Sequence, residues 1–144
     1  MTQPVSAQES CGQPPEIAGR IPTLRTFSMP ADANANGDIF GGWILSQMDM
    51  AGGAKAYEFV GDRVVTVGIE AMTFHKPVFI GDEVSFYTEV SSVGRTSVTI
   101  KIESWARRRQ TREYAKVTEG LFTFVHIDEN RMPAAIPVRD QGKK

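Results

Sequence analysis

One stretch of the chain restricts what the remainder can fold into. Turn-forming residues and two adjacent glycines, Gly41 and Gly42, precede a proline-free run to Glu58 that is long enough for about four helical turns. The segments after it are shorter, rich in β-branched residues, and separated by turn residues. We therefore expect a single long helix, with most of the other residues in strands.

The glycine pair at the start of this helix has two interpretations. Glycine has no Cβ, so another molecule can approach its backbone closely. The first N–H groups of a helix lack intrahelical partners and lie at the positive end of the helix dipole. Gly41 and Gly42 could thus offer amides to an anion or a polarised carbonyl. The alternative is a tight loop that requires small residues.

Two aspartates are the best candidates for chemistry. Asp49 lies seven residues after Gly42, about two turns further on and on roughly the same side of the helix. Its neighbours are Met48 and Met50, and a buried carboxylate in such a segment costs free energy unless it is hydrogen-bonded. The alternative is an exposed position. Asp38 is a weaker candidate, because it follows turn residues and can be one itself.

The remaining pattern predicts an α+β fold with an antiparallel sheet. Alternation is clearest after residue 96, where Val98, Ile100 and Ile102 would face the core. Short turns between strands favour antiparallel pairing, and the helix must cover one face of the sheet. The expected strands are residues 24–29, 64–70 with an extension to 77, 84–90, 97–105 and 116–127.

The last expected strand predicts a partner. It places Leu121, Val125 and Ile127 on one face and Phe122 and Phe124 on the other, as in a strand covered on both faces. One helix hides only part of a five-stranded sheet. We therefore expect a second subunit to supply the missing cover, and at least a homodimer.

Composition sets further limits. A chain of 144 residues fits one domain, which we place at 23–137 between a flexible N-terminal arm, 1–22, and a flexible basic tail, 138–144. A net charge of −1 gives no indication of nucleic-acid binding, and no apolar run approaches the ~20 residues needed to span a membrane. Cys11 is the only cysteine, which fits a cytoplasmic protein. Two separated histidines do not suggest a metal site.

Three segments resemble one family. They are the stretch from Met29 to Asp49 (with Asn-Gly-Asp-Ile-Phe-Gly-Gly), Met-Thr-Phe-His-Lys-Pro at 72–77, and Val-Gly-Arg-Thr-Ser at 93–97. Together they resemble the YciA-type acyl-CoA thioesterases over about residues 24–137. The resemblance implies the hotdog fold, in which a five- to six-stranded antiparallel sheet wraps one long central helix. It also implies dimers through the sheet edge, assembled into a homohexamer, a trimer of dimers.

The implied activity is hydrolysis of acyl-CoA to a carboxylic acid and coenzyme A, without a cofactor. The resemblance places the catalytic carboxylate on Asp49, as general base or nucleophile, and Asp38 beside it at the subunit boundary. The Gly42 amide would stabilise the oxyanion. We expect substrate contacts from Asn36, Gly41, His75, Lys76, Gly94, Arg95, Thr96 and Ser97. The arginines at 107–109 are weaker candidates for the phosphates of coenzyme A.

Two alternatives remain open. Hydratases of this fold use histidine with a carboxylate, but no histidine lies in the expected helix or the loop before it. His126 is near the end of the last strand, where we expect a structural role. A non-enzymatic sensor of acyl-CoA would keep the phosphate contacts but would not need Asp49 among apolar neighbours.

Overall fold

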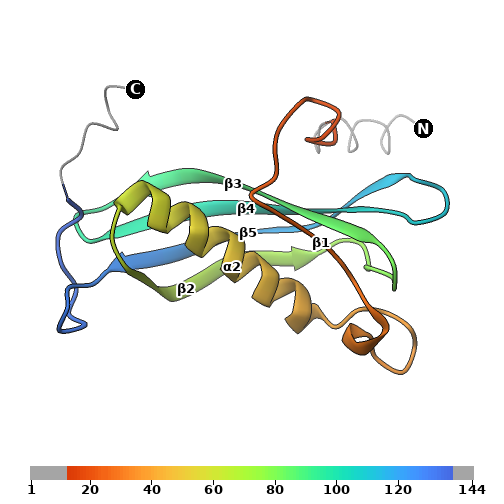
Figure 1. The fold of residues 1–144 in the computed structure, drawn as a ribbon, viewed down its shortest axis with the longest axis horizontal. Helices are drawn as coiled ribbons and strands as arrows, with labels where there is room; N and C mark the ends of the chain where they lie inside the picture. Colours follow the sequence, from red (N-terminus) through yellow and green to blue (C-terminus); the bar gives the residue numbers. More distant parts are fainter. Residues whose placement is uncertain (1–12, 138–144) are drawn as a thin grey trace.

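The computed structural model describes residues 13–137 (Figure 1). Five strands form one antiparallel sheet in the order β1-β3-β4-β5-β2. The single long helix is confirmed. The first expected strand ends at Phe27 instead of residue 29, and the extension of the second strand ends at Phe74 instead of residue 77. The elements are β1 Leu24–Phe27, the 3-10 turn η1 Pro30–Asp32, α2 Gly41–Val60, β2 Val64–Phe74, β3 Glu83–Val93, β4 Ser97–Arg107 and β5 Tyr114–His126.

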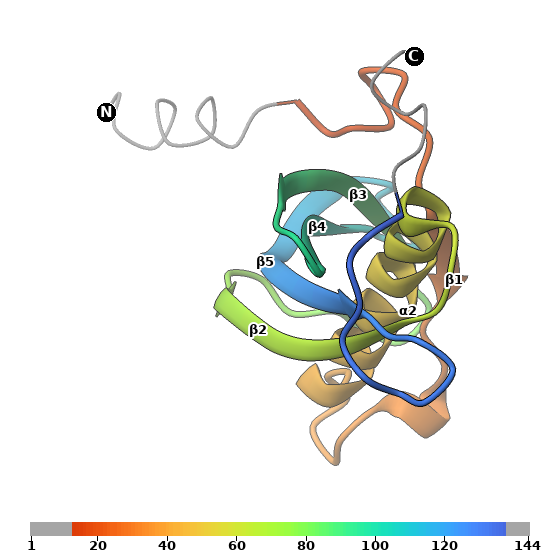
Figure 2. The same cartoon turned by 90° about the vertical axis from the view of Figure 1, so that its left-hand side faces the viewer.

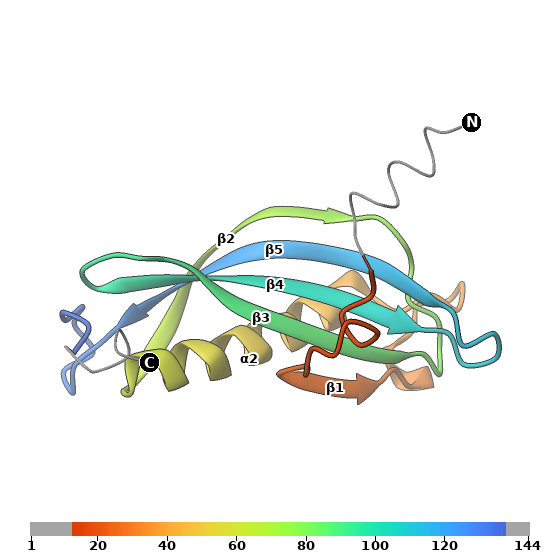
Figure 3. The same ribbon diagram turned by 90° about the horizontal axis from the view of Figure 1, so that it is seen from above.

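The sheet curves around α2. Seen along the helix, β2, β5, β4 and β3 form an arc with α2 on its concave side, and seen from above α2 runs along the length of the sheet (Figures 2 and 3). This is the arrangement expected of a hotdog fold. The short β1 pairs with β3 at one edge, while β2 forms the other edge.

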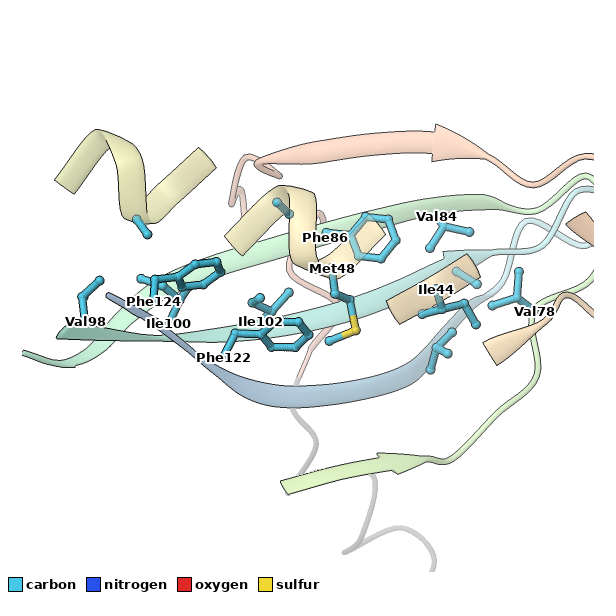
Figure 4. Close-up of a cluster of buried hydrophobic side chains, with 14 of the residues drawn as sticks. Ile44, Met48, Val78, Val84, Phe86, Val98, Ile100, Ile102, Phe122 and Phe124 are labelled. Atoms are coloured by element: carbon cyan, nitrogen blue, oxygen red, sulfur yellow. The ribbon is translucent and has the colours of Figure 1, made fainter. Parts of the chain in front are cut away.

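The core fills the space between α2 and the sheet. Met48 points from the helix toward Phe86, Ile102 and Phe122, all fully buried (Figure 4). Val98, Ile100 and Ile102 face this core as predicted. Gly52 lets the helix approach closely, because a Cβ there would lie 2.6 Å from Cδ1 of Ile102.

The two ends of α2 differ in how they are capped. At its C-terminus Gly61 adopts φ 82°, and its N–H donates to the carbonyl of Tyr57 at 2.7 Å. Glycine is favoured there because a left-handed conformation is costly with a Cβ. At its N-terminus Phe40 provides no side-chain cap.

Strand β2 is an exposed edge with apolar side chains. Val67 is 57 % exposed and Ile69 is 41 % exposed. A bulge between Glu70 and Thr73 shifts the register against β5, and Ala71 within it has φ 60°. An apolar edge of this length is suited to pairing with another chain.

The termini are described only in part. Residues 1–12 of the expected arm and the whole tail, 138–144, lie outside the described residues. Within the described part of the arm, Glu16 forms an ion pair with Arg25, and the Arg20 guanidinium lies 5.2 Å from the centre of the Tyr87 ring. The arm's flexibility stays a prediction. None of the helices within 13–137 is long and apolar enough to cross a membrane.

Candidate active site

The N-terminus of α2 presents backbone donors. The first amides bonded to the Phe40 carbonyl are those of Trp43, at 3.1 Å, and Ile44, at 3.4 Å. Among the described residues, the amides of Gly41 and Gly42 have no acceptor. A Cβ on Gly42 would meet nothing within 4 Å, so the space beside it is open. Both observations agree with donors left available to a ligand.

The loop before the helix is organised by Asn34. Its Oδ1 accepts from the backbone N–H groups of Asn36, at 2.9 Å, and Asp38, at 3.1 Å. Gly37 between them has φ 89°, which glycine adopts readily. The backbone of Asp38 bridges to Phe79, which attaches the loop to the segment before β3. Asp38 is therefore fixed beside the helix N-terminus, whereas the Asn36 side chain is exposed.

A cleft of about 300 Å³ opens next to this N-terminus. One wall comes from the start of the helix and includes Gly41 and Ile44; the other comes from the end of β2 and includes Phe74, His75 and Lys76. Ile39, Pro77 and Val78 complete the lining. The structure thus brings together three of the predicted substrate-binding residues, namely Gly41, His75 and Lys76.

Asp49 lies between the helix and β2. Its Oδ1 accepts a hydrogen bond of 2.6 Å from the hydroxyl of Thr66, and the side chain is half-buried. Such a contact fixes one oxygen of the carboxylate and leaves the other available. Thr66 is not among the site residues predicted from the sequence. No sequence signal joins it to Asp49, because the contact links a helix to a strand 17 residues later.

Asp49 does not line the cleft at the helix N-terminus. Seven helical residues separate it from Gly42, which corresponds to about 10 Å along the axis. The Gly42 amide and the Asp49 carboxylate lie on similar sides of the helix. Within one protomer, however, they are too far apart to contact the same small group of a substrate.

The hairpin from Gly94 to Ser97 lies at the opposite end of the helix. The carbonyl of Thr96 accepts from the His126 amide at 2.8 Å, and the neighbouring Ile127 amide donates to Arg63, just beyond the helix C-terminus. The 20 residues of α2 span about 30 Å. Within one protomer the predicted residues Gly94, Arg95, Thr96 and Ser97 are therefore remote from Gly42.

Arg108, in the basic segment after β4, is engaged within the protein. Its guanidinium donates to the buried Asp82 carboxylate and to the Pro77 carbonyl, and lies 4.6 Å from the centre of the Phe79 ring. These contacts hold the segment that follows His75 and Lys76. Arg108 is thus a support for the cleft wall, with its positive charge paired, rather than a free phosphate ligand.

Comparison with known proteins identifies the family. The family model described as "Thioesterase superfamily" matches residues 36–112, which include the glycine pair, Asp49 and the hairpin. The acyl-CoA thioester hydrolase YciA of Escherichia coli is 49 % identical over 118 residues, covering 80 % of this chain and 89 % of the relative.

The chain belongs to the YciA-type acyl-CoA thioesterases. An acyl-CoA thioester hydrolase of Haemophilus influenzae is similarly 49 % identical to this thioesterase over 117 residues, covering 79 % of this chain and 76 % of the relative.

Solved structures share the fold of this thioesterase. A hexameric thioesterase of Yersinia pestis has a TM-score of 0.78 at 45 % identity, covering 83 % of this chain and 97 % of that chain. A hexameric hotdog-fold thioesterase of Campylobacter jejuni has a TM-score of 0.76 at 40 % identity, covering 81 % of this chain and 90 % of that chain. A hexameric, broad-specificity acyl-coenzyme A thioesterase was solved as an aspartate-to-alanine mutant. It has a TM-score of 0.80 at 46 % identity, covering 83 % of this chain and 88 % of that chain.

Proposed function

We propose that this protein hydrolyses acyl-CoA thioesters to a free carboxylic acid and coenzyme A, at sites shared between two copies of the chain. The observation that carries the proposal is the Asp49 carboxylate, held by Thr66 beside an exposed strand edge. Family membership supports the substrate class, and the free amides of Gly41 and Gly42 supply the second requirement of acyl transfer.

Pairing two β2 edges would complete the site. An antiparallel pair centred on Ile69 sets Phe74 of one copy opposite Val64 of the other. Gly41 lies against Phe74, since a Cβ on this glycine would be 3.5 Å from Cζ of that ring. Thr66 lies two residues from Val64, and its hydroxyl donates a hydrogen bond to the Asp49 carboxylate. Such a dimer would therefore bring the helix N-terminus of one copy to the Asp49 carboxylate of the other.

The proposed chemistry divides the work between the two copies. The thioester carbonyl oxygen accepts hydrogen bonds from the Gly42 amide, and from that of Gly41, as negative charge develops on it. Asp49 of the other copy either removes a proton from an attacking water or attacks the carbonyl carbon itself. The C–S bond then breaks, the coenzyme A sulfur leaves, and it takes up a proton. On the water route this releases the carboxylic acid directly. On the nucleophilic route it leaves a mixed anhydride on Asp49, which water then hydrolyses to the carboxylic acid and the free carboxylate. Asp38 orients the water, and Asn36 supports its loop through its backbone N–H, which donates to Asn34.

The same proposed dimer also accounts for contacts with coenzyme A. His75 and Lys76 line the cleft and provide polar and cationic groups. The paired copy would bring its own helix C-terminal end, with the hairpin from Gly94 to Ser97, toward this cleft. Arg95 of that hairpin is exposed and suits a bidentate phosphate contact. Three such dimers would form the hexamer that the solved relatives adopt.

Replacing Asp49 by Asn tests the proposal. The change keeps the shape and the hydrogen-bond acceptor but removes the base, so kcat should fall by about 10²–10⁴. Turnover is followed with a thiol reagent and acyl-CoAs of several chain lengths, and coenzyme A binding by calorimetry. Glu58→Gln is the matched control, since Glu58 is an exposed acid on the same helix. Undiminished turnover by folded Asp49→Asn protein would remove Asp49 from the mechanism.

The alternatives give different outcomes in the same assays. A sensor would bind coenzyme A but release no thiol in the wild type. A hydratase would hydrate an enoyl thioester and depend on a histidine near the substrate. The His126 ring is buried and hydrogen-bonded at both nitrogens, which leaves His75 as the candidate. His75 lines the cleft, and within residues 13–137 no hydrogen bond or ion pair joins its ring to a carboxylate.

A further inference from the structure

The His126 side chain lies at the C-terminal end of α2, where three segments meet. The ring is 7 % exposed. Its Nε2 is 3.0 Å from a carboxylate oxygen of Asp62, in the turn after the helix. Its Nδ1 is 3.1 Å from the carbonyl oxygen of Ala134 and 2.9 Å from that of Ala135.

Within residues 13–137, every hydrogen-bond partner of the ring is an acceptor. A carboxylate and two carbonyl oxygens have no proton to donate at neutral pH, whereas a neutral imidazole carries only one N–H. Neutral His126 would therefore direct a lone pair at an acceptor. Only the doubly protonated imidazolium satisfies both sides, so this geometry calls for a positive charge.

The charged surroundings agree with this assignment. The hydrogen bond that His126 donates to Asp62 raises the pKa of His126 above its usual value of 6.5. The two backbone carbonyls act in the same direction, and burial acts against them. The same bond lowers the pKa of Asp62. Within the described residues, the guanidinium of Arg63 lies 4.0 Å from Asp62, Arg95 is exposed on the hairpin, and residues 134–136 contribute no charged side chain.

Two backbone hydrogen bonds link the surroundings of the His126 ring to the hairpin from Gly94 to Ser97. The His126 amide donates to the Thr96 carbonyl at 2.8 Å. The Ile136 amide donates to the Arg95 carbonyl at 2.8 Å, and the segment leading to Ile136 is the one whose carbonyls receive the His126 ring. The ring thus fastens the C-terminal segment that in turn holds the backbone of Arg95.

We propose that His126, as an imidazolium bonded to Asp62, is a positioning residue that fixes the Arg95 hairpin for the phosphates of coenzyme A. The inference rests on the proposed function, because that function gives Arg95 its ligand. His126 itself touches neither substrate nor reacting atoms. Its protonation state sets the affinity for the nucleotide part of the substrate, while the chemical step is independent of it.

The first experiment compares wild type with His126→Gln. The KM for acyl-CoA should rise by about three- to tenfold with kcat unchanged, because charge-assisted bonds to the C-terminal segment are lost. The KM for the matching acyl-pantetheine, which lacks the nucleotide phosphates, should stay the same. Glu129→Gln removes an exposed charge in the turn after β5 and serves as the control. An equal rise of KM for both substrates, or a fall in kcat, would overturn the proposal.

A double-mutant cycle tests whether His126 acts through Arg95. The affinity of coenzyme A is measured by calorimetry in His126→Gln, Arg95→Ala and the double variant. The double variant should bind no more weakly than Arg95→Ala alone. Without the Arg95 side chain there is no phosphate contact left for His126 to position. Additive losses would show that His126 supports binding by another route and would overturn the proposal.

The pH profile gives a readout that general destabilisation would not produce. The affinity for coenzyme A should weaken as the pH rises through the raised pKa of His126, and Asp62→Asn should move that transition to lower pH. The ring is observed directly by nitrogen NMR, since the chain has two histidines and His126→Gln assigns the signals. A His126 ring that is neutral at pH 7 would refute the proposal even if Asp62→Asn or His126→Gln folded poorly.

These results separate the two proposals. If the wild type releases no thiol from acyl-CoA, the proposed function fails, while coenzyme A calorimetry and NMR still decide on His126. If the wild type hydrolyses acyl-CoA and His126→Gln retains the wild-type KM, the function stands and the positioning role fails.

Discussion

The two ends of α2 are built in opposite ways. At the N-terminus Gly41 and Gly42 have free amides, no side-chain cap and open space around them. At the C-terminus Gly61 closes the last turn, and Asp62 binds the buried His126 ring. The exposed amides of Gly41 and Gly42 stay accessible to a ligand, as the proposed oxyanion role requires, whereas the other end of the helix is closed by hydrogen bonds within the protein.

Among the variants that compare the two ends of α2, the largest effect should come from removing a donor at the N-terminus. Gly42→Pro deletes the proposed oxyanion donor at a position where proline suits the first helical turn, and should lower kcat by about 10²–10³. Gly42→Ala keeps the N–H, and its methyl group meets open space, so its kcat should stay near that of the wild type. Steady-state kinetics with acyl-CoA, alongside circular dichroism, provide the measurement. Equal kcat values for the two variants would contradict the proposed donor.

A smaller effect is expected from Thr66, which orients the carboxylate in the N-terminal half of the helix. Thr66→Val removes the hydroxyl donor to Asp49 while keeping the shape, and should lower kcat by about tenfold, consistent with loss of one hydrogen bond to a charged group. Thr73→Val, at an exposed position on the same strand, is the control. Equal turnover by both variants would show that Asp49 is positioned without Thr66.

At the C-terminus the expected loss is in stability instead of turnover. Gly61→Ala places a Cβ at φ 82° and should reduce the free energy of unfolding by about 1 kcal/mol, with kcat unchanged. Gly53→Ala is a useful contrast, because its Cβ would make only an ordinary contact at 3.7 Å and alanine favours the helix. Urea unfolding measures both. A loss of kcat in Gly61→Ala would show that the two ends are coupled.

The smallest effect is the pH dependence of stability. A raised pKa means that folded His126 binds its proton more tightly than the unfolded chain does, so this contribution is complete below the unfolded value of 6.5 and disappears as pH rises through the folded pKa. The lowered pKa of Asp62 has the opposite sign: its contribution is present above 3.8 and is lost as pH falls through the folded pKa. Both contributions are therefore complete between the two unfolded values, 3.8 and 6.5, and the pair stabilises most in that range.

Urea midpoints between pH 6 and 9 measure this dependence. The midpoint of the wild type should fall with rising pH over this range more than that of Asp62→Asn does. Parallel curves for the two proteins would show that the pair contributes nothing to folding stability.

Much of the fold was predictable because it follows from local patterns. The proline-free run after Gly42 predicts α2, and the alternation of Val98, Ile100 and Ile102 predicts an inward face of β4 that the structure confirms. Gly41, His75 and Lys76 meet in one cleft because the family segments that contain them are adjacent in this fold.

The unpredicted contacts depend on the curvature of the sheet. Spacing alone places Asp49 on the same side as Gly42, but not beside Thr66 and outside the cleft. Asp62 and His126, 64 residues apart, meet only because β5 ends next to the helix C-terminus. Sequence periodicity specifies which side of an element a residue occupies; it contains no information about which other element covers that side.

The bulge at Ala71 has a consequence for self-assembly. A long, flat, apolar edge strand can pair with one chain after another, and the resulting assembly can grow into a fibre. Here the bulge between Glu70 and Thr73 interrupts the regular spacing of donors and acceptors near the end of β2. Open-ended edge-to-edge pairing is less favourable along such an irregular edge, so the bulge works against runaway polymerisation.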